Sequence, residues 1–252
     1  MKMSNSFISY QKDILLAFIT SIVGYMVLIS TNRVGLVDLT IEAVLFSLAS
    51  IIGFNGYRRS SKSINKHFKK FELFYGITYL IAVVSFIIGI YFFANNPTIL
   101  EIELRNVTES TLLIIMSLIK SSSLIFLIFT WSYFYKYLKI SASTRKNILM
   151  FLSGFLLYLM LSIVIWLITN DLNVLSLGIV VGSVIGIFAM IAQDKRTRYL
   201  TIIFIIYSSI HLVEFYMMGL GKSLASGLNN PVYWGVTVLY FCEVNRWINN
   251  EI

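Results

Sequence analysis

Eight long apolar segments, separated by short polar stretches, dominate the pattern of this chain. Each is about 18–26 residues long, roughly the length that an α-helix needs to cross ~30 Å of hydrocarbon. Lipid offers no hydrogen-bond partner to backbone N–H and C=O groups, so each segment should be helical. The sequence therefore predicts an all-α polytopic membrane protein with eight transmembrane helices. The predicted spans are 13–31, 36–57, 71–94, 111–136, 147–169, 174–193, 199–220 and 231–248.

Basic residues gather in every second connection between these segments. Of the 20 Lys and Arg residues, 16 fall on one predicted side, around the N-terminus, 58–70, 136–146, 195–198 and Arg246. The other side carries Arg33, Arg105 and Lys222, together with Glu101, Glu103, Glu109 and Asp171. The positive-inside rule then predicts a multi-pass protein of the cell membrane with both termini in the cytoplasm.

Composition narrows the class of function. Hydrophobic residues make up 58% of the chain, against about 45–50% in a typical soluble domain. The net charge of +8 is explained by loops such as 58–70 lying near anionic lipid headgroups. No connection is long enough to form a folded basic domain, so we expect a lipid bilayer as partner and no nucleic acid.

The order of segments repeats along the chain. Both predicted triplets contain a basic loop, an aromatic-rich span and an outer loop with Asn-Asn-Pro (at 95–97 and 229–231). We predict an extra N-terminal helix (1–35), a three-helix repeat (36–146), an inverting linker helix (147–173) and a second three-helix repeat (174–252). Such a 3+1+3 parallel repeat is typical of transporters, with the substrate site between the halves near the midplane.

Gly178, Gly182 and Gly186 recur at four-residue spacing in the sixth segment. Small residues on one helix face let a neighbouring backbone approach closely. We expect tight helix packing on this face, with a sliding surface as the alternative.

Ionisable residues inside apolar segments are the first candidates for a site, because they are costly at membrane depth. They are Glu42, Lys120, His211, Glu214 and Glu243. Lys120 lies about 14 Å into its helix, near mid-bilayer, either in a cavity or in an ion pair with Glu214 or Glu42. His211 and Glu214 share a helix face and either line a substrate path or join two helices. They are too few for a metal site.

Aromatic residues are the second candidates. Tyr79, Tyr207 and Tyr216 lie deep enough to stack on a flat ring, which suits a heteroaromatic, sugar-bearing ligand. Trp131, Tyr133, Tyr135 and Trp247 close their segments, and we expect them to form an interfacial belt. No nucleophile elbow, zinc-protease motif or phosphate-binding loop occurs, so we expect neither an enzyme nor a cofactor.

Five short motifs resemble the PnuC-type nicotinamide riboside (nicotinamide mononucleotide) transporter family, in the same order. They are Asp38-Leu39-Thr40-Ile41-Glu42-Ala43-Val44, Phe74-Tyr75-Gly76-Ile77, Trp131 before a basic loop, Ala189-Met190-Ile191, and Arg246-Trp247-Ile248-Asn249. The resemblance implies facilitated diffusion of a vitamin-like nucleoside through a pocket between the triplets. It also implies that a separate cytoplasmic kinase traps the substrate without forming a stable complex.

The chain departs from that family at substrate-facing positions. The family's Glu-Asn-Trp-x-x-Trp falls on Tyr199, Leu200, Thr201 and Phe204, a family Asn falls on Ser208, and a family Gln falls on Lys120. These changes suggest a ligand of different charge.

We therefore predict a permease for a small vitamin-like or nucleoside substrate, with nicotinamide riboside as the first candidate. The alternative is a non-transporting multi-pass protein with an assembly, immunity or sensor role. A homo-oligomer is compatible with either function. The predicted substrate-binding residues are Lys120, Tyr79, Tyr207, Ser208, His211 and Glu214.

Overall fold

The computed structural model describes residues 2–30, 34–60, 65–95, 111–140, 143–169, 172–219 and 226–251. They form eight α-helices and one 3₁₀ turn, and no strand occurs within these ranges. The helices are α1 (Lys2–Ile29), α2 (Val34–Arg59), α3 (Lys66–Asn95), α4 (Thr111–Leu138), α5 (Thr144–Thr169), α6 (Leu172–Ile191), α7 (Arg198–Gly219) and α8 (Ser226–Glu251). The turn η2 (Lys195–Thr197) joins α6 to α7.

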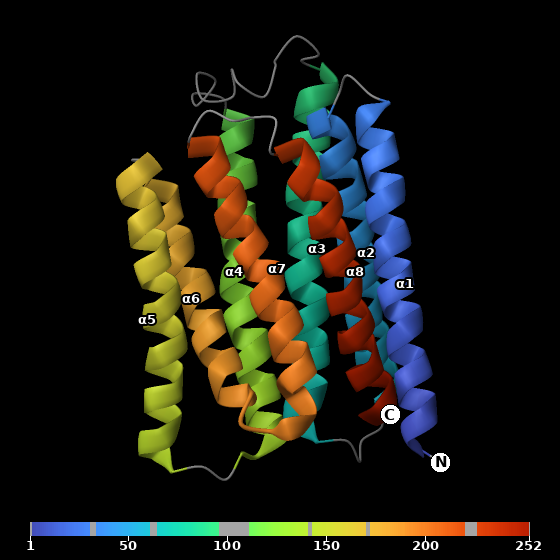
Figure 1. The fold of residues 1–252 in the computed structure, drawn as a ribbon, viewed down its shortest axis with the longest axis vertical. Coiled ribbons are helices and arrows are strands. Elements are labelled where there is room, and N and C mark those ends of the chain that lie inside the picture. The colour runs from blue at the N-terminus through green and yellow to red at the C-terminus, as the bar shows by residue number, and fades with distance from the viewer. Residues whose placement is uncertain are drawn as a thin grey trace.

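The eight helices run side by side along the long axis of the molecule (Figure 1). Successive helices alternate in direction, so both marked termini lie at the same end as the C-terminal ends of α2, α4 and α6. That end, called the basic end below, carries Arg58 and Arg59 of α2, Lys66 of α3 and Lys136 of α4. The residues that we predicted to face the opposite side, Arg33, Arg105 and Lys222 among them, lie outside the described residues.

Each predicted span coincides with an observed helix, but several helices extend beyond it. α1, α3 and α8 begin at Lys2, Lys66 and Ser226, ahead of the predicted 13, 71 and 231. The apolar pattern marks only the part of a helix that avoids water, whereas backbone hydrogen bonding continues into polar residues.

Among the described residues, three helical segments are long and apolar enough to cross a membrane. They are Leu36–Arg59, Lys66–Phe92 and Thr144–Ile168. The segment Gly178–Ile191 is apolar but shorter. The all-helical fold is thus confirmed, and the count of eight membrane spans remains a prediction.

The packing order follows the predicted triplets in part. α3 lies between α2 and α4, and α7 contacts both α6 and α8. Across the two groups, α4 packs on α6 and α2 packs on α8. The remaining helices pack on the second group, α1 against α8 and α5 against α6.

Glycines create the closest backbone approaches between helices. A Cβ on Gly53 of α2 would lie 2.5 Å from the backbone nitrogen of Gly76 on α3. A Cβ on Gly235 of α8 would lie 2.8 Å from the carbonyl oxygen of Ala17 on α1. At both crossings one backbone rests on another with no room for a side chain.

The predicted packing role of the α6 glycines is confirmed. A Cβ on Gly178 would lie 2.5 Å from Ser162, and one on Gly186 would lie 2.8 Å from the carbonyl oxygen of Phe151. Both contacts are on α5. α5 therefore packs against the glycine face of α6.

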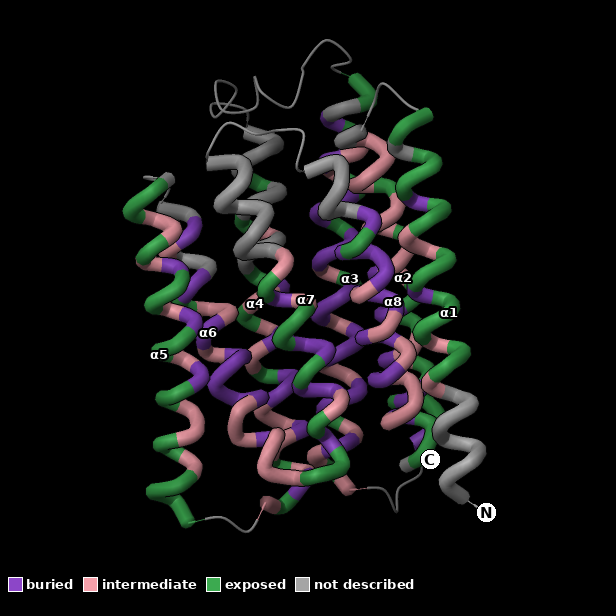
Figure 2. Tube along the Cα trace, in the orientation of Figure 1, coloured by how far each residue is buried: buried purple, intermediate pink, exposed green. Residues whose placement is uncertain are grey.

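The outer surfaces of α1 and α5 are apolar and exposed (Figure 2). On α5, Leu157 and Leu167 are 65% and 69% exposed, and on α1 Phe18 and Ile29 are 61% and 68% exposed. Isolated exposed apolar side chains are ordinary, but continuous stripes on whole helices mark a surface that meets an apolar environment.

Candidate ligand-binding site at the centre of the bundle

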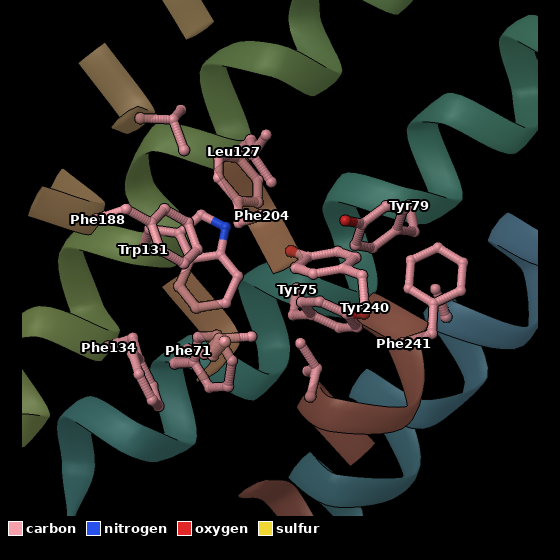
Figure 3. Packing of buried hydrophobic residues seen from close by; sticks show 14 of the residues in the cluster. Phe71, Tyr75, Tyr79, Leu127, Trp131, Phe134, Phe188, Phe204, Tyr240 and Phe241 are labelled. Carbon is pink, nitrogen blue, oxygen red and sulfur yellow. The ribbon is translucent and has the colours of Figure 1, made fainter. Parts of the chain in front are cut away.

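A group of six aromatic side chains fills the space between the two helix triplets. This central aromatic cluster consists of Tyr75, Tyr79, Trp131, Phe204, Tyr207 and Tyr240. Figure 3 shows Tyr75, Tyr79, Trp131 and Tyr240 converging from α3, α4 and α8. α3 and α4 belong to the first predicted triplet (α2–α4), and α7 and α8 belong to the second (α6–α8), so the cluster lies where these two groups of helices meet.

Tyr75 and Tyr79 enter the cluster from one face of α3, because residues four apart lie one turn above each other. Their ring centroids are 4.7 Å apart in an edge-on arrangement. Tyr79 also meets the ring of Phe241 on α8 at 5.2 Å. The two side chains therefore join α3 directly to the second triplet.

Trp131 is the contribution of α4 and is fully buried. Its ring lies 4.4 Å from Phe188 on α6 and 6.1 Å from Tyr240 on α8. Phe188 in turn stacks on Phe204 of α7, with centroids 4.0 Å apart and planes 7° apart. One indole thus contacts two helices of the opposite triplet.

Three tyrosines of α7 and α8 form a stacked column. Tyr207 stacks between Tyr233 at 5.3 Å and Tyr240 at 5.4 Å. The hydroxyl oxygens of Tyr207 and Tyr233 are 3.0 Å apart and share a hydrogen bond. Both faces of the Tyr207 ring are therefore covered by rings of α8.

The cluster contains buried polar atoms that make no hydrogen bond of normal geometry. They are the hydroxyl oxygens of Tyr75 and Tyr240 and the indole nitrogen of Trp131. The Tyr79 hydroxyl lies near both tyrosine hydroxyls, and the Trp131 indole lies near that of Tyr240. All three side chains are 0% exposed. A buried polar group without a partner costs about 1–3 kcal/mol, so three of them at one place require an explanation.

This arrangement suits a flat ligand that carries hydrogen-bonding groups, and aromatic faces also attract a positively charged ring. Aromatic faces stack on a planar ring, while hydroxyl and indole N–H groups donate to its carbonyl or sugar oxygens. The described part of the chain holds no group of three or more His, Cys, Asp or Glu residues able to bind a metal ion. Stacking and hydrogen bonding are interactions that the described side chains of the cluster can make.

The structure places three of the six predicted site residues. Tyr79 and Tyr207 both belong to the central aromatic cluster. Ser208 is buried nearby, but its hydroxyl donates to the carbonyl of Phe204 in its own helix. The carbonyl of Ser208 accepts a hydrogen bond of 3.2 Å from the Tyr158 hydroxyl on α5. Ser208 thus lies at the contact between α7 and α5.

The other three predicted residues are placed only by their backbones. Lys120 lies in α4, and His211 and Glu214 lie in α7. Their side chains fall outside the described residues. The predicted pairing of Lys120 with Glu214 or Glu42 stays a prediction.

The expected interfacial role of Trp131 is wrong. Its indole is in the middle of the core instead of the membrane boundary. An apolar helix gives no indication of which face meets lipid and which meets protein, so the position near a segment end was misleading. Trp247 also packs inward, edge-on to Phe134 at 5.3 Å.

A buried carboxylate that the sequence reasoning passed over lies where α2 crosses α3. Glu72 is 0% exposed and accepts a hydrogen bond from the hydroxyl of Ser60. The ammonium group of Lys69 lies 3.2 Å from the Ser60 carbonyl oxygen, donating to it. Glu72 lies at the edge of its apolar segment. In the sequence, only its spacing from Gly76 and Tyr79 on the same helix indicates that its side chain points inward.

A second polar group joins α1 to α8 near the basic end. Arg246 forms ion pairs with Asp13 on α1 and Glu243 on its own helix. Its guanidinium carbon lies 4.0 Å from the ring centroid of Tyr10. Partial burial and the carboxylate of Glu243 raise the pKa of Tyr10. α1 is therefore held against α8 by ion pairs as well as by glycine packing.

Comparisons with known proteins add no assignment. No family model, curated protein or solved structure matches this chain.

Proposed function

We propose that this protein is a multi-pass membrane permease for a small vitamin-like or nucleoside substrate, with nicotinamide riboside as the first candidate. It works by facilitated diffusion through a site between α2–α4 and α6–α8. The observation that carries the proposal is the central aromatic cluster, in which three buried polar atoms make no hydrogen bond of normal geometry. A bound ligand would supply well-aligned hydrogen bonds to them.

The exposed apolar surface supports a membrane location. Three long apolar helical segments and the exposed stripes on α1 and α5 would be costly in water. α5 illustrates this best, because residues such as Leu157 and Leu167 are exposed along an almost wholly apolar helix.

The contacts between helices support two related triplets. If α2–α4 and α6–α8 are parallel repeats around one axis, the last helix of each should meet the first helix of the other. The pairs α4–α6 and α8–α2 have this relationship. Substrate sites of such transporters lie at the repeat interface, which is where the aromatic cluster is found.

The chemistry of the cluster supports the class of substrate. A pyridine or nucleobase ring could enter the stack of Tyr207 and Tyr240 once these two rings move apart. The hydroxyl groups of Tyr75 and Tyr240 and the indole N–H of Trp131, which make no hydrogen bond of normal geometry, suit amide and ribose oxygens. Passage requires these side chains to rotate or the two triplets to separate, since the cluster is closed in this structure.

The test is uptake of labelled nicotinamide riboside into vesicles from a host that lacks its own transporter. We expect wild-type protein to equilibrate the label without an ion gradient. Trp131→Leu should reduce uptake at least about tenfold, because one stacking and one donor group together are worth roughly 1.4 kcal/mol or more. Absence of wild-type uptake would rule out this substrate.

Two further variants test the predicted charged residues. Lys120→Gln restores the side chain expected from the family resemblance, and Glu214→Gln removes a charge at nearly constant shape. If both leave uptake of every tested nucleoside unchanged, these residues do not belong to the substrate path.

One observation favours the alternative, a non-transporting membrane protein. Tyr75, Trp131 and Tyr240 are completely buried, as expected for a permanently closed core. The discriminating result is ligand protection: a closed core predicts that no nucleoside raises the melting temperature, whereas a permease predicts an increase that Trp131→Leu abolishes.

A further inference from the structure

We propose that the surface formed by α3 and α4 around Tyr133, at the basic end, is a binding site for one anionic phospholipid. The headgroup lies beside Lys70, Lys136 and His67 around the ring of Tyr133, and the acyl chains follow Phe74 and Phe129. This inference rests on the membrane location in the proposed function, but it does not depend on transport.

Three basic side chains from two helices converge on one tyrosine. The ammonium nitrogens of Lys70 on α3 and Lys136 on α4 lie 5.2 Å and 5.6 Å from the ring centroid of Tyr133. The ring of His67 stacks on the same tyrosine with centroids 6.5 Å apart and planes 24° apart. Cation–π attraction holds the two ammonium groups at the Tyr133 ring, although like charges so close together repel each other.

No carboxylate on α3 or α4 neutralises this group. Glu72 is the only acidic residue in either helix. It is turned toward α2, where Ser60 donates to it. Lys66 and Lys139 also lie close enough to His67 to influence it electrostatically. In addition, the buried Nδ1 atom of His67 has no hydrogen-bond partner. The group therefore fits a ligand that brings negative charge and acceptor oxygens.

The surface next to the basic group is apolar, and this favours a lipid over a soluble phosphate. Tyr133 stacks on Phe74 at 5.2 Å, and Phe74 lies 6.2 Å from Phe129. Phe129 and Ile125, one and two turns from Tyr133 along α4, are 49% and 51% exposed. Basic and aromatic groups at a helix end, continued by exposed apolar side chains, match the two parts of a phospholipid.

The experiment measures lipid binding to purified protein in a neutral detergent. Dioleoylphosphatidylglycerol and dioleoylphosphatidylcholine are titrated separately, and bound lipid is counted by native mass spectrometry. Wild-type protein should prefer phosphatidylglycerol. Lys70→Gln combined with Lys136→Gln should weaken that binding about 30-fold, since each basic residue near a membrane surface contributes roughly a factor of five, and should leave phosphatidylcholine binding unchanged.

The matched control is Arg145→Gln combined with Lys146→Gln. It removes the same charge from exposed residues at the basic end, at the start of α5. We expect its phosphatidylglycerol affinity to stay within about twofold of wild type. An equal loss in both double variants would show a diffuse surface field and overturn the site, as would no loss in either.

Two further measurements allow the experiment to contradict the proposal in other ways. If the Lys70/Lys136 double variant does not give a single folded species, each single variant should show about a fivefold loss. If glycerol 3-phosphate binds as tightly as phosphatidylglycerol, the ligand is a soluble phosphate and the lipid assignment is wrong.

Discussion

Two kinds of helix interface hold this molecule together, and they differ in what lies between the backbones. At the α2–α3, α5–α6 and α1–α8 interfaces, glycines bring one backbone against the next. Between the triplets, the helices are separated by the rings of the central aromatic cluster. The glycine contacts hold helices together in pairs. The aromatic cluster joins one group of helices to the other.

The difference indicates where movement and binding can take place. A backbone that rests on a neighbouring backbone has no rotamers to change, so a glycine interface has few alternative arrangements. Aromatic side chains can rotate, and those at the triplet boundary carry polar atoms that lack partners. We therefore expect glycine interfaces to respond to mutation through stability, and the aromatic interface to respond through ligand binding.

The largest effect is expected at the α2–α3 crossing. Gly53→Val places a side chain 2.5–2.9 Å from the backbone of α3, which cannot give way without moving the helix. We expect a loss of about 3 kcal/mol or more in the free energy of unfolding, measured by thermal denaturation in detergent. Leu48→Val, on the exposed face of the same helix, is the control and should melt close to wild type. Equal melting of both variants would contradict a backbone contact.

The next effect concerns the buried hydrogen bond beside that crossing. Ser60→Ala removes the hydroxyl that donates to the buried carboxyl group of Glu72, and we expect a loss of about 2 kcal/mol in the free energy of unfolding. Ser47→Ala is the matched control, because the Ser47 hydroxyl bonds only to Ala43 of its own helix. Its expected effect is within about 0.5 kcal/mol. If the two variants are equally stable, Glu72 does not depend on Ser60.

A pair of Tyr→Phe variants tests the aromatic interface. Tyr240→Phe removes a buried hydroxyl without a partner, so its stability should equal or exceed that of wild type by up to about 1 kcal/mol. Tyr233→Phe breaks the hydrogen bond to Tyr207 and should cost about 1 kcal/mol. The measurement is again thermal unfolding. A larger loss for Tyr240→Phe than for Tyr233→Phe would show that the Tyr240 hydroxyl is paired.

The smallest effect is expected outside both kinds of interface, at the turn between α6 and α7. The guanidinium group of Arg196, which donates to Asp194, lowers the pKa of that carboxyl group. Its stabilisation is present above the unfolded pKa of about 3.9 and is lost as pH falls through the lower folded value. Asp194→Asn should cost about 0.5 kcal/mol at pH 7, and the difference should shrink as pH falls below about 3.9. A difference that does not change with pH would point to hydrogen bonding instead of charge.

The helices and one interface could be predicted from the sequence. Apolar runs located all eight helices, and the spacing of Gly178, Gly182 and Gly186 correctly indicated a packing face. Each of these patterns lies within a single segment, so it can be recognised without knowing which helices pack together. The helix ends were less accurate, because polar residues such as those before 71 remain helical.

The candidate site could be predicted only in part. Tyr79 and Tyr207 were identified from their depth in apolar segments. Tyr240 and the inward position of Trp131 were missed, because their partners lie on other helices far along the chain. Segments that are apolar on every side do not distinguish lipid from core, so only the assembled bundle shows which aromatic rings meet.

The most direct test of the central claim compares uptake and stability in the same preparations. Wild type, Tyr240→Phe and Tyr233→Phe are reconstituted into liposomes, and entry of labelled nicotinamide riboside is measured alongside the melting temperature. We expect Tyr240→Phe to lose most uptake while keeping wild-type stability, and Tyr233→Phe to be destabilised but still to transport. Wild-type uptake that is unchanged by Tyr240→Phe would contradict a substrate path through the aromatic boundary between the triplets.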